Sequence, residues 1–173
     1  MAILEVSDLK QYFYLEPTFL AKLVGGEKPR VIKAVDGMSF SMEPGEILGL
    51  AGESGCGKSV TAHSIIRLIP DPPGKIVSGR ILFDGNDLLK IPEDRMRRIR
   101  GNRISMIFQE PMTSLNPIHR IGRQVAEVLQ LHKDVSRREA MTLAIEMLDH
   151  VGIPDSRRRA NEFPHQMSGG MRQ

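Results

Sequence analysis

The segment GESGCGKS, from Gly52 to Ser59, constrains this 173-residue chain more than any other stretch. It has the pattern G-x-x-x-x-G-K-[ST], in which a glycine-rich backbone wraps a polyphosphate and turns successive N–H groups toward it. The aliphatic run 46–51 before it suits a buried strand, and residues 58–68 after it carry apolar side chains at helical spacing. Strand, loop and helix in this order predict an α/β chain that binds a nucleoside triphosphate.

Each position of this phosphate loop has its own predicted role. Gly52, Gly55 and Gly57 give the backbone its freedom to wrap the ligand. Lys58 reaches the β- and γ-phosphates as a catalytic cation, and the hydroxyl of Ser59 ligates the bridging Mg²⁺. The residues predicted to line the nucleotide here are Gly52, Glu53, Ser54, Gly55, Cys56, Gly57, Lys58, Ser59 and Val60.

Composition narrows the class of protein. With 40 % hydrophobic residues the chain can bury a core, and its net charge of +3 is mild. Apolar residues interrupt the basic stretch 95–103, which favours a solvated helix end over a nucleic-acid footprint. The single cysteine, Cys56, cannot form an internal disulfide, which fits a reducing compartment. We expect no secretory signal and no membrane span, so any action at a membrane requires a partner.

Periodicity and breakers predict strands before and after the loop. Residues 15–30 carry two prolines and two glycines, which predicts a loop or insertion. A short basic helix is predicted at 88–100, with Pro92 close to its first turn. Tight turns are predicted at 43–45 and 84–85. The predicted strands are 2–9, 34–42, 47–51, 76–83 and 102–109.

The last third of the chain has helical periodicity. Ser136 with Glu139 three residues later predicts a capping box, and Gly152 predicts the end of the helix that it opens. We predict two domains: a nucleotide-binding core with an antiparallel β subdomain at 1–108, and a helical subdomain at 109–173. The apolar residues expected to line one face of each helix are Ile121, Val125, Val128 and Leu129, then Ala140, Ala144, Met147, Leu148 and Val151.

The segment Met167–Gln173 places Ser-Gly-Gly at a predicted helix start, a second anion-binding arrangement. Alone it is weak, because such turns are common. Together with GESGCGKS and ISMIFQEPMTSLNP, however, FPHQMSGGMRQ resembles the ATP-binding-cassette ATPases, and more narrowly the ATPase subunits of bacterial dipeptide and oligopeptide importers. The resemblance implies that Ser168, Gly169 and Gly170 bind the ATP held by a second ATPase subunit in a head-to-tail dimer. Methionine stands where the common signature has leucine at 167 and glutamine at 171.

The same resemblance assigns two further residues. It makes Gln109 the glutamine whose amide reaches the Mg²⁺ and its water, as a catalytic and metal-binding residue. Phe13 aligns with the aromatic residue that stacks on adenine, although Tyr12 or Tyr14 can take this role if the register differs. Without the resemblance, Gln109 is interpreted as a glutamine in solvent at the end of a strand. Phe13 is then interpreted as an apolar residue of a strand.

The resemblance also implies residues that we do not find. The Mg²⁺-holding aspartate, the adjoining catalytic glutamate and the switch histidine follow the signature motif in the family, beyond Gln173. Residues 81–84 come nearest, but Asp84 with Gly85 predicts a hairpin turn instead. The expected fold is a P-loop ATPase of the cassette type with the C-terminal part of its core sheet missing. We expect residues 1–173 alone to be poorly soluble and inactive.

The sequence therefore predicts an ATP-binding subunit that couples ATP binding and hydrolysis to peptide import. Its expected partners are a second ATPase subunit, identical or different, membrane permease subunits and, indirectly, a solute-binding protein, but no nucleic acid. Its expected location is peripheral, at the cytoplasmic face of the membrane. The alternatives are a soluble cassette ATPase of translation or DNA repair, and a nucleotide-binding module without catalysis. A GTPase is disfavoured because no Asn-Lys-x-Asp motif occurs.

Overall fold

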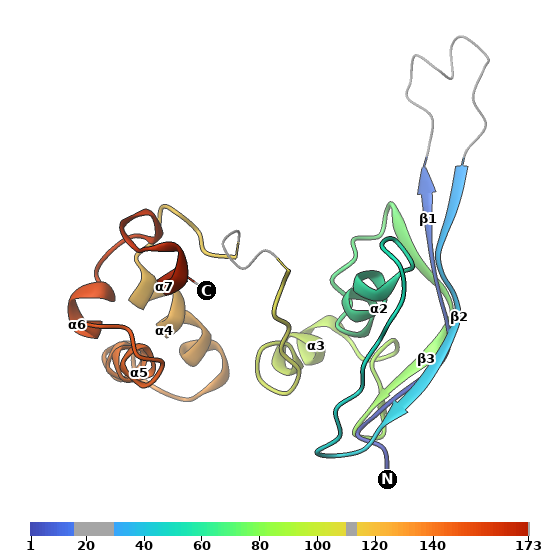
Figure 1. Cartoon of the computed structure of the whole chain (residues 1–173). Helices are drawn as coiled ribbons and strands as arrows, with labels where there is room; N and C mark the ends of the chain where they lie inside the picture. The colour runs from blue at the N-terminus through green and yellow to red at the C-terminus, as the bar shows by residue number, and fades with distance from the viewer. Residues whose placement is uncertain (16–29, 110–113, 173) are drawn as a thin grey trace. The chain divides into compact units, whose positions relative to one another are not determined.

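The computed structural model describes residues 1–15, 30–109 and 114–172. These residues fall into two compact units, Met1–Met96 and Arg97–Gln173, called here the first unit and the helical unit (Figure 1). The predicted loop at 15–30 lies almost entirely outside the described residues. The predicted division into domains after residue 108 stays a prediction.

The first unit contains an antiparallel sheet (Figure 1). Its four strands are β1 (Leu4–Leu15), β2 (Arg30–Met42), β3 (Gly74–Phe83) and β4 (Asn86–Asp87), in the order β2-β1-β3-β4. β1 lies in the middle and pairs with β2 and β3 along most of its length. The strands predicted at 2–9, 34–42 and 76–83 are confirmed, each longer than its apolar pattern indicated.

Register shifts along β1 set which side chains face the core. The register shifts around Asp8 and again between Gln11 and Tyr12. Gly79 makes the first shift possible, because a Cβ on it would lie 2.7 Å from the Asp8 carbonyl oxygen, and its φ is +108°. Leu9 and Gln11 are consequently buried on one face of the sheet.

Helix α2 (Lys58–Ile65) packs against β1 and β2. Its buried side is polar as well as apolar: the Thr61 hydroxyl donates to the carbonyl oxygen of Gly57 at 2.9 Å and lies 3.4 Å from the sulfur of Met38 on β2. The helix ends before the predicted Leu68, because Arg67 adopts a left-handed conformation with φ 52°. The arginine then donates to the carbonyl oxygen of Ile91, just before the next helix.

That next helix, α3 (Glu93–Ile99), is shorter than the predicted 88–100. Two acidic residues occupy its first turn and two arginines its last, which matches the helix dipole at both ends. Met96 on its inner side is fully buried. The hairpin turn predicted at 84–85 is also confirmed, since Phe83 pairs with Asn86 across it.

The helical unit contains α4 (Ile121–His132), α5 (Arg137–His150), α6 (Ser156–Arg159), a 3₁₀ turn (Pro164–Gln166) and α7 (Gly169–Arg172). The predicted capping box is confirmed, because Ser136 and Glu139 exchange both hydrogen bonds at the start of α5. The buried residues form two adjoining clusters, one of Ile121, Leu148, Ala160 and Met167, and one of Ala126, Leu129, Ala140 and Ala144.

Two predicted strands are wrong. Residues 47–51 form no strand, and 102–109 contain only an isolated bridge between Arg100 and Ile104. Both runs are apolar as predicted, but within the described residues neither finds a partner strand to complete its hydrogen bonds. Their apolar side chains are exposed instead, with Ile47 96 % and Ile107 91 % accessible.

The predicted helix faces need a smaller correction. Val128 on α4 and Met147 on α5 were expected to lie with the buried residues, as was Val151 after α5. All three are exposed, whereas Ala140, Ala144 and Leu148 are buried as predicted. The apolar stripe of each helix is wider than the neighbouring helix covers, so its margin faces solvent.

Candidate nucleotide site

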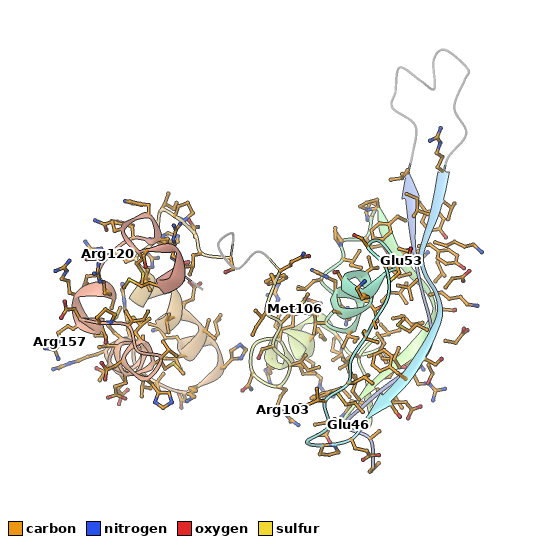
Figure 2. The ribbon with its side chains drawn as sticks, in the orientation of Figure 1. Glu46, Glu53, Arg103, Met106, Arg120 and Arg157 are labelled. Carbon is orange, nitrogen blue, oxygen red and sulfur yellow. The ribbon has the colours of Figure 1, made fainter. Side chains whose placement is uncertain are left out.

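The phosphate loop bends tightly into the start of α2. The N–H of Cys56 donates to the carbonyl oxygen of Glu53 at 3.3 Å, and Gly57 is the left-handed N-cap of the helix with φ 91°. A Cβ on Gly57 would collide with the carbonyl oxygen of Ala34 on β2, so only glycine fits at this position. Figure 2 labels Glu53 within this loop, close to α2 and the sheet.

Lys58 occupies the interior of the loop. Its Nζ donates to the carbonyl oxygens of Gly52 at 2.7 Å and of Glu53 at 2.8 Å, and lies 3.4 Å from the sulfur of Cys56. The ammonium group is thus held where a polyphosphate would need a cation. An anion entering the loop would replace the two carbonyl oxygens as acceptors.

The N-terminus of α2 favours an anion. Its first turn contains no acidic residue, and no side chain caps its backbone N–H groups. Partial positive charge therefore accumulates at the point where the loop opens. The neighbouring Ser54, Gly55 and Ser59 are exposed, and Val60 is half-buried.

The described residues hold no group of three or more histidine, cysteine, aspartate or glutamate side chains that would bind a metal by themselves. An exposed hydroxyl beside a phosphate loop nevertheless fits Mg²⁺, which takes oxygen ligands and completes its octahedron with phosphate and water. Ser59 is such a donor. Gln109 is exposed and belongs to the helical unit. Its coordination of the same Mg²⁺ stays a prediction.

The strand register separates the three aromatic candidates. A Cβ on Gly74 would lie 2.9 Å from Gln11 Nε2 and 3.0 Å from a ring carbon of Phe13, and it would also meet Ile69, which follows α2. The side chains of Gln11 and Phe13 therefore lie on the α2 side of the sheet. Successive strand residues alternate between faces, which puts Tyr12 and Tyr14 on the other side. Of the three, Phe13 is therefore on the side of the phosphate loop.

Tyr12 has a separate polar role on the opposite face. Its hydroxyl donates to Asp36 Oδ1 at 2.6 Å, and Lys33 lies 3.4 Å from Oδ2 and 5.3 Å from the tyrosine ring. The carboxylate raises the pKa of Tyr12, and the hydrogen bond from Tyr12 lowers the pKa of Asp36. This network fixes Tyr12 between neighbouring strands.

The second motif begins a helix, as predicted. Ser168 precedes α7, and its hydroxyl accepts a hydrogen bond from the N–H of Met171 at 3.4 Å. Gly169 and Gly170 are exposed, and a Cβ on either would meet no atom within 4 Å. The motif belongs to the helical unit, so its predicted contact with nucleotide stays a prediction.

Sequence reasoning missed one contributor to the site. Ala34 and Val35 of β2 lie against Gly57, at the point where the phosphate loop enters α2. No motif marks these two residues, because an Ala-Val pair in a strand is ordinary. Only the pairing of β2 with β1 reveals that this part of the strand passes beneath the loop.

Comparisons with known proteins agree with this geometry. The sequence profile of the family described as ABC transporter matches residues 35–173. A probable peptide ABC transporter ATP-binding protein of Sinorhizobium fredii is 52 % identical over 171 residues, which is 99 % of this chain and 48 % of that protein. The oligopeptide transport ATP-binding protein OppD of Bacillus subtilis is 47 % identical, covering 99 % of this chain and 44 % of its own length. The chain thus spans about half the length of these relatives.

Two solved structures share the fold. A dimeric post-hydrolysis ATP-binding cassette bound to ADP and Pi gives a TM-score of 0.71 at 21 % identity, and a dimeric bacterial ABC transporter cassette gives 0.73 at 22 %. Each alignment covers 98 % of this chain and 65 % of the other. The predicted fold class, including its antiparallel and helical parts, is confirmed. The chain belongs to the ABC transporter family.

Proposed function

We propose that this chain provides the ATP-binding part of an ABC importer subunit, which couples ATP binding and hydrolysis to the uptake of peptides across a membrane. The observation that carries the proposal is the phosphate loop, in which two carbonyl oxygens hold Lys58 Nζ beside an uncapped helix N-terminus. Its extension to peptide import draws on two relatives, which are named for peptide and oligopeptide transport.

In this proposal the residues divide the work as follows. The loop N–H groups and Lys58 bind the phosphates, Ser59 contributes a ligand to Mg²⁺, and Phe13 stacks on the adenine ring. Mg²⁺, when bound, neutralises charge that develops on the phosphates. Gln109 positions water near the metal. Ser168, Gly169 and Gly170 bind the ATP of a second subunit, so that two ATP molecules close the dimer.

The apolar margin of the helical unit supports a permease partner. Val128 and Met147 are exposed, and both line a cavity of about 660 Å³ beside α4. A surface of this kind suits an amphipathic segment of a membrane subunit. None of the helices in the described part of the chain has the length and apolar character needed to cross a membrane. We infer a peripheral position at the cytoplasmic face.

The proposal is tested first by ATP binding. Lys58→Ala should weaken binding by about tenfold or more, because a charged hydrogen bond to phosphate contributes roughly 1.5–3 kcal/mol. The control is Lys90→Ala, since Lys90 is exposed and pairs with Asp87 at 3.5 Å, outside the phosphate loop. Equal affinities of the two variants, measured by calorimetry, would refute the assignment of the loop.

The adenine contact is tested by an aromatic series. Phe13→Ala should weaken ATP binding by about tenfold, because stacking on a base contributes roughly 1–3 kcal/mol, and Phe13→Tyr should retain it. Tyr14→Ala, on the opposite face, should leave the affinity unchanged. A loss in Tyr14→Ala without one in Phe13→Ala would assign the base to the other face.

Transport requires the complete system. In proteoliposomes that contain the full ATPase subunits, permease and binding protein, Lys58→Ala should abolish ATP-driven uptake of a labelled oligopeptide, whereas Lys90→Ala should not. We further infer that residues 1–173 alone do not hydrolyse ATP, because their nearest candidate for the second acidic strand end, Asp84, lies in a hairpin turn. Mg²⁺-dependent turnover that disappears in Lys58→Ala would contradict this inference.

A further inference from the structure

The helical unit contains a second basic site that the nucleotide chemistry does not use. A cavity of about 770 Å³ opens between the start of α4, the start of α5 and the segment after α6. Its apolar floor includes Ala126 and Ala160, which are buried, and Met141. It lies entirely within the helical unit and shares no residue with the phosphate loop. We call it the arginine cavity.

Three guanidinium groups line this cavity, from Arg120, Arg123 and Arg137. Among the residues that the structure describes, the side chains of Arg123 and Arg137 form no ion pair or hydrogen bond. One carboxylate, that of Glu127, also lines the cavity, which leaves an excess of positive charge. Elsewhere in the same unit arginines are paired: Arg158 and Arg159 both bind Glu162, at 3.1 and 2.7 Å.

An aromatic wall holds the third arginine in place. The guanidinium carbon of Arg120 lies 5.9 Å from the centre of the Phe163 ring, and that ring also stacks on His165, with 5.7 Å between the ring centres. Figure 2 shows Arg120 at the beginning of α4. A stacked guanidinium loses less conformational freedom when its N–H groups meet a ligand. The Phe163 ring thus orients the guanidinium group of Arg120 and also provides an apolar surface for a ligand.

The two flanks of α4 have different chemistry. Arg120, Arg123, Glu127 and Gln130 recur at spacings of three or four residues and line the arginine cavity. The apolar patch that includes Val128 belongs to the other flank. The two hollows share His119 and Glu127, but Arg120, Arg123 and Arg137 line the arginine cavity alone, so a compact anion suits it better than an apolar helix.

The chemistry favours phosphate over carboxylate. A guanidinium fork binds one carboxylate with two parallel hydrogen bonds, which leaves the other arginines unpaired. A phosphate monoester offers three oxygens and nearly two negative charges at neutral pH. We propose that the arginine cavity binds a phosphate monoester, with its organic part against Phe163 and Met141. The shared chemistry admits two sources, a soluble phosphorylated molecule and the headgroup of a phosphatidic acid.

Phenyl phosphate is the probe for the soluble source. It is titrated calorimetrically into the full ATPase subunit carrying Lys58→Ala, so that the phosphate loop does not contribute. Arg123→Gln and Arg137→Gln should each weaken binding by about fivefold, the upper end for an exposed charge pair. Glu127→Gln should strengthen binding, because it removes the one carboxylate in the lining. The arginine variants should lower the affinity and the glutamate variant should raise it. A variant that merely unfolds the chain would lower the affinity in every case.

The matched control is Arg138→Gln. Arg138 follows Arg137 in α5 but lines a different surface hollow, with Thr142 and Leu143. It should leave the affinity for phenyl phosphate unchanged. If Arg137→Gln and Arg138→Gln behave alike, or if Glu127→Gln has no effect, the binding is unspecific attraction to positive charge and the proposal is wrong.

Vesicle sedimentation tests the lipid source in the same background. Phosphatidylcholine vesicles are compared with and without phosphatidic acid. Vesicle binding that depends on phosphatidic acid and falls in Arg137→Gln but not in Arg138→Gln assigns the site to a lipid headgroup, and phenyl phosphate binding alone assigns it to a soluble ligand. If neither probe binds, the proposal is overturned. The proposed ATPase function is unaffected, since no cavity residue belongs to the nucleotide site.

Discussion

Ala140, Ala144 and Leu148 of α5 are buried in the helical unit, whereas Ile47, Leu48 and Leu50 before the phosphate loop are exposed in the first unit. Both runs are apolar and both were expected inside. The difference lies in the hydrogen bonds, because a helix satisfies its backbone within its own segment and a strand needs a neighbour. Apolar helices can therefore assemble a core from local sequence, whereas an apolar strand is buried only when its partner strands are present.

Core truncation should separate the two regions most strongly. Leu148→Ala is expected to destabilise the helical unit by about 2–4 kcal/mol, because it leaves a cavity among Ile121, Ala160 and Met167. Ile47→Ala is expected to change stability by less than about 0.5 kcal/mol, since Ile47 is 96 % accessible. Native-state hydrogen exchange measures both. A large loss at Ile47 would show that residues 47–51 are buried in solution.

Overpacking should have the next largest effect. Gly122 lies where α4 meets α6, and a Cβ on it would lie 2.8 Å from both the Cβ and the carbonyl oxygen of Ala160. Gly122→Ala should cost about 1–3 kcal/mol despite the better helix propensity of alanine. The control is Gly169→Ala, because a Cβ on Gly169 in α7 would meet no atom within 4 Å. Gly45→Ala is unsuitable as a control because the φ of Gly45 is positive. Gly169→Ala should leave the unfolding free energy nearly unchanged in denaturant titration.

The fold was predictable from the sequence wherever its cause is local. The capping box at Ser136 and the turn at Asp84 follow from residues at most three positions apart, and both are confirmed. The strands at 47–51 and 102–109 were not predictable in this way, because their formation depends on other strands. The choice among Tyr12, Phe13 and Tyr14 likewise required the pairing of β1 with β3, because Gly74 of β3 is the residue that lies against the Phe13 ring.

The site followed the same rule. The phosphate loop around Lys58 was recognisable from a motif of consecutive residues, and its contacts with a nucleotide stay a prediction. The arginine cavity was not, because Arg120, Arg137 and Phe163 are far apart in the chain and meet only through helix packing. A charged residue at the start of a helix indicates solvent exposure in general, so the sequence offered no reason to join these three.

Removing the helix cap should have a smaller effect. Ser136→Ala deletes the hydroxyl that accepts from the N–H of Glu139 at 3.3 Å. It should destabilise the helical unit by about 0.5–2 kcal/mol and leave the first unit unchanged. Ser136→Thr should retain most of the stability. Hydrogen exchange measures the stability of each unit. An equal loss of stability in both units would mean that they unfold together and that the helical unit has no independent core.

The smallest effect is that of pH on the same cap. Hydrogen bonds from Ser136 lower the pKa of Glu139 in the folded chain. Its contribution to stability is therefore complete above the ordinary pKa of 4.5 and is lost as the pH falls through the lowered value. Glu139→Gln should remove this pH dependence, which urea titrations across the acidic range would measure. A variant that retains the full acid sensitivity would place its origin elsewhere.

The two hydrogen bonds from Lys58 to the carbonyl oxygens of Gly52 and Glu53 have a consequence for selectivity. Without a ligand, the Lys58 ammonium group occupies the loop and is already hydrogen-bonded to both carbonyl oxygens. Any anion must offer acceptors good enough to displace both carbonyl oxygens at once. A triphosphate offers oxygens on neighbouring β- and γ-phosphates, so both N–H groups of Lys58 can find new acceptors while the loop N–H groups bind the rest of the chain. We therefore expect the loop to bind a triphosphate more tightly than a monophosphate before any base is recognised.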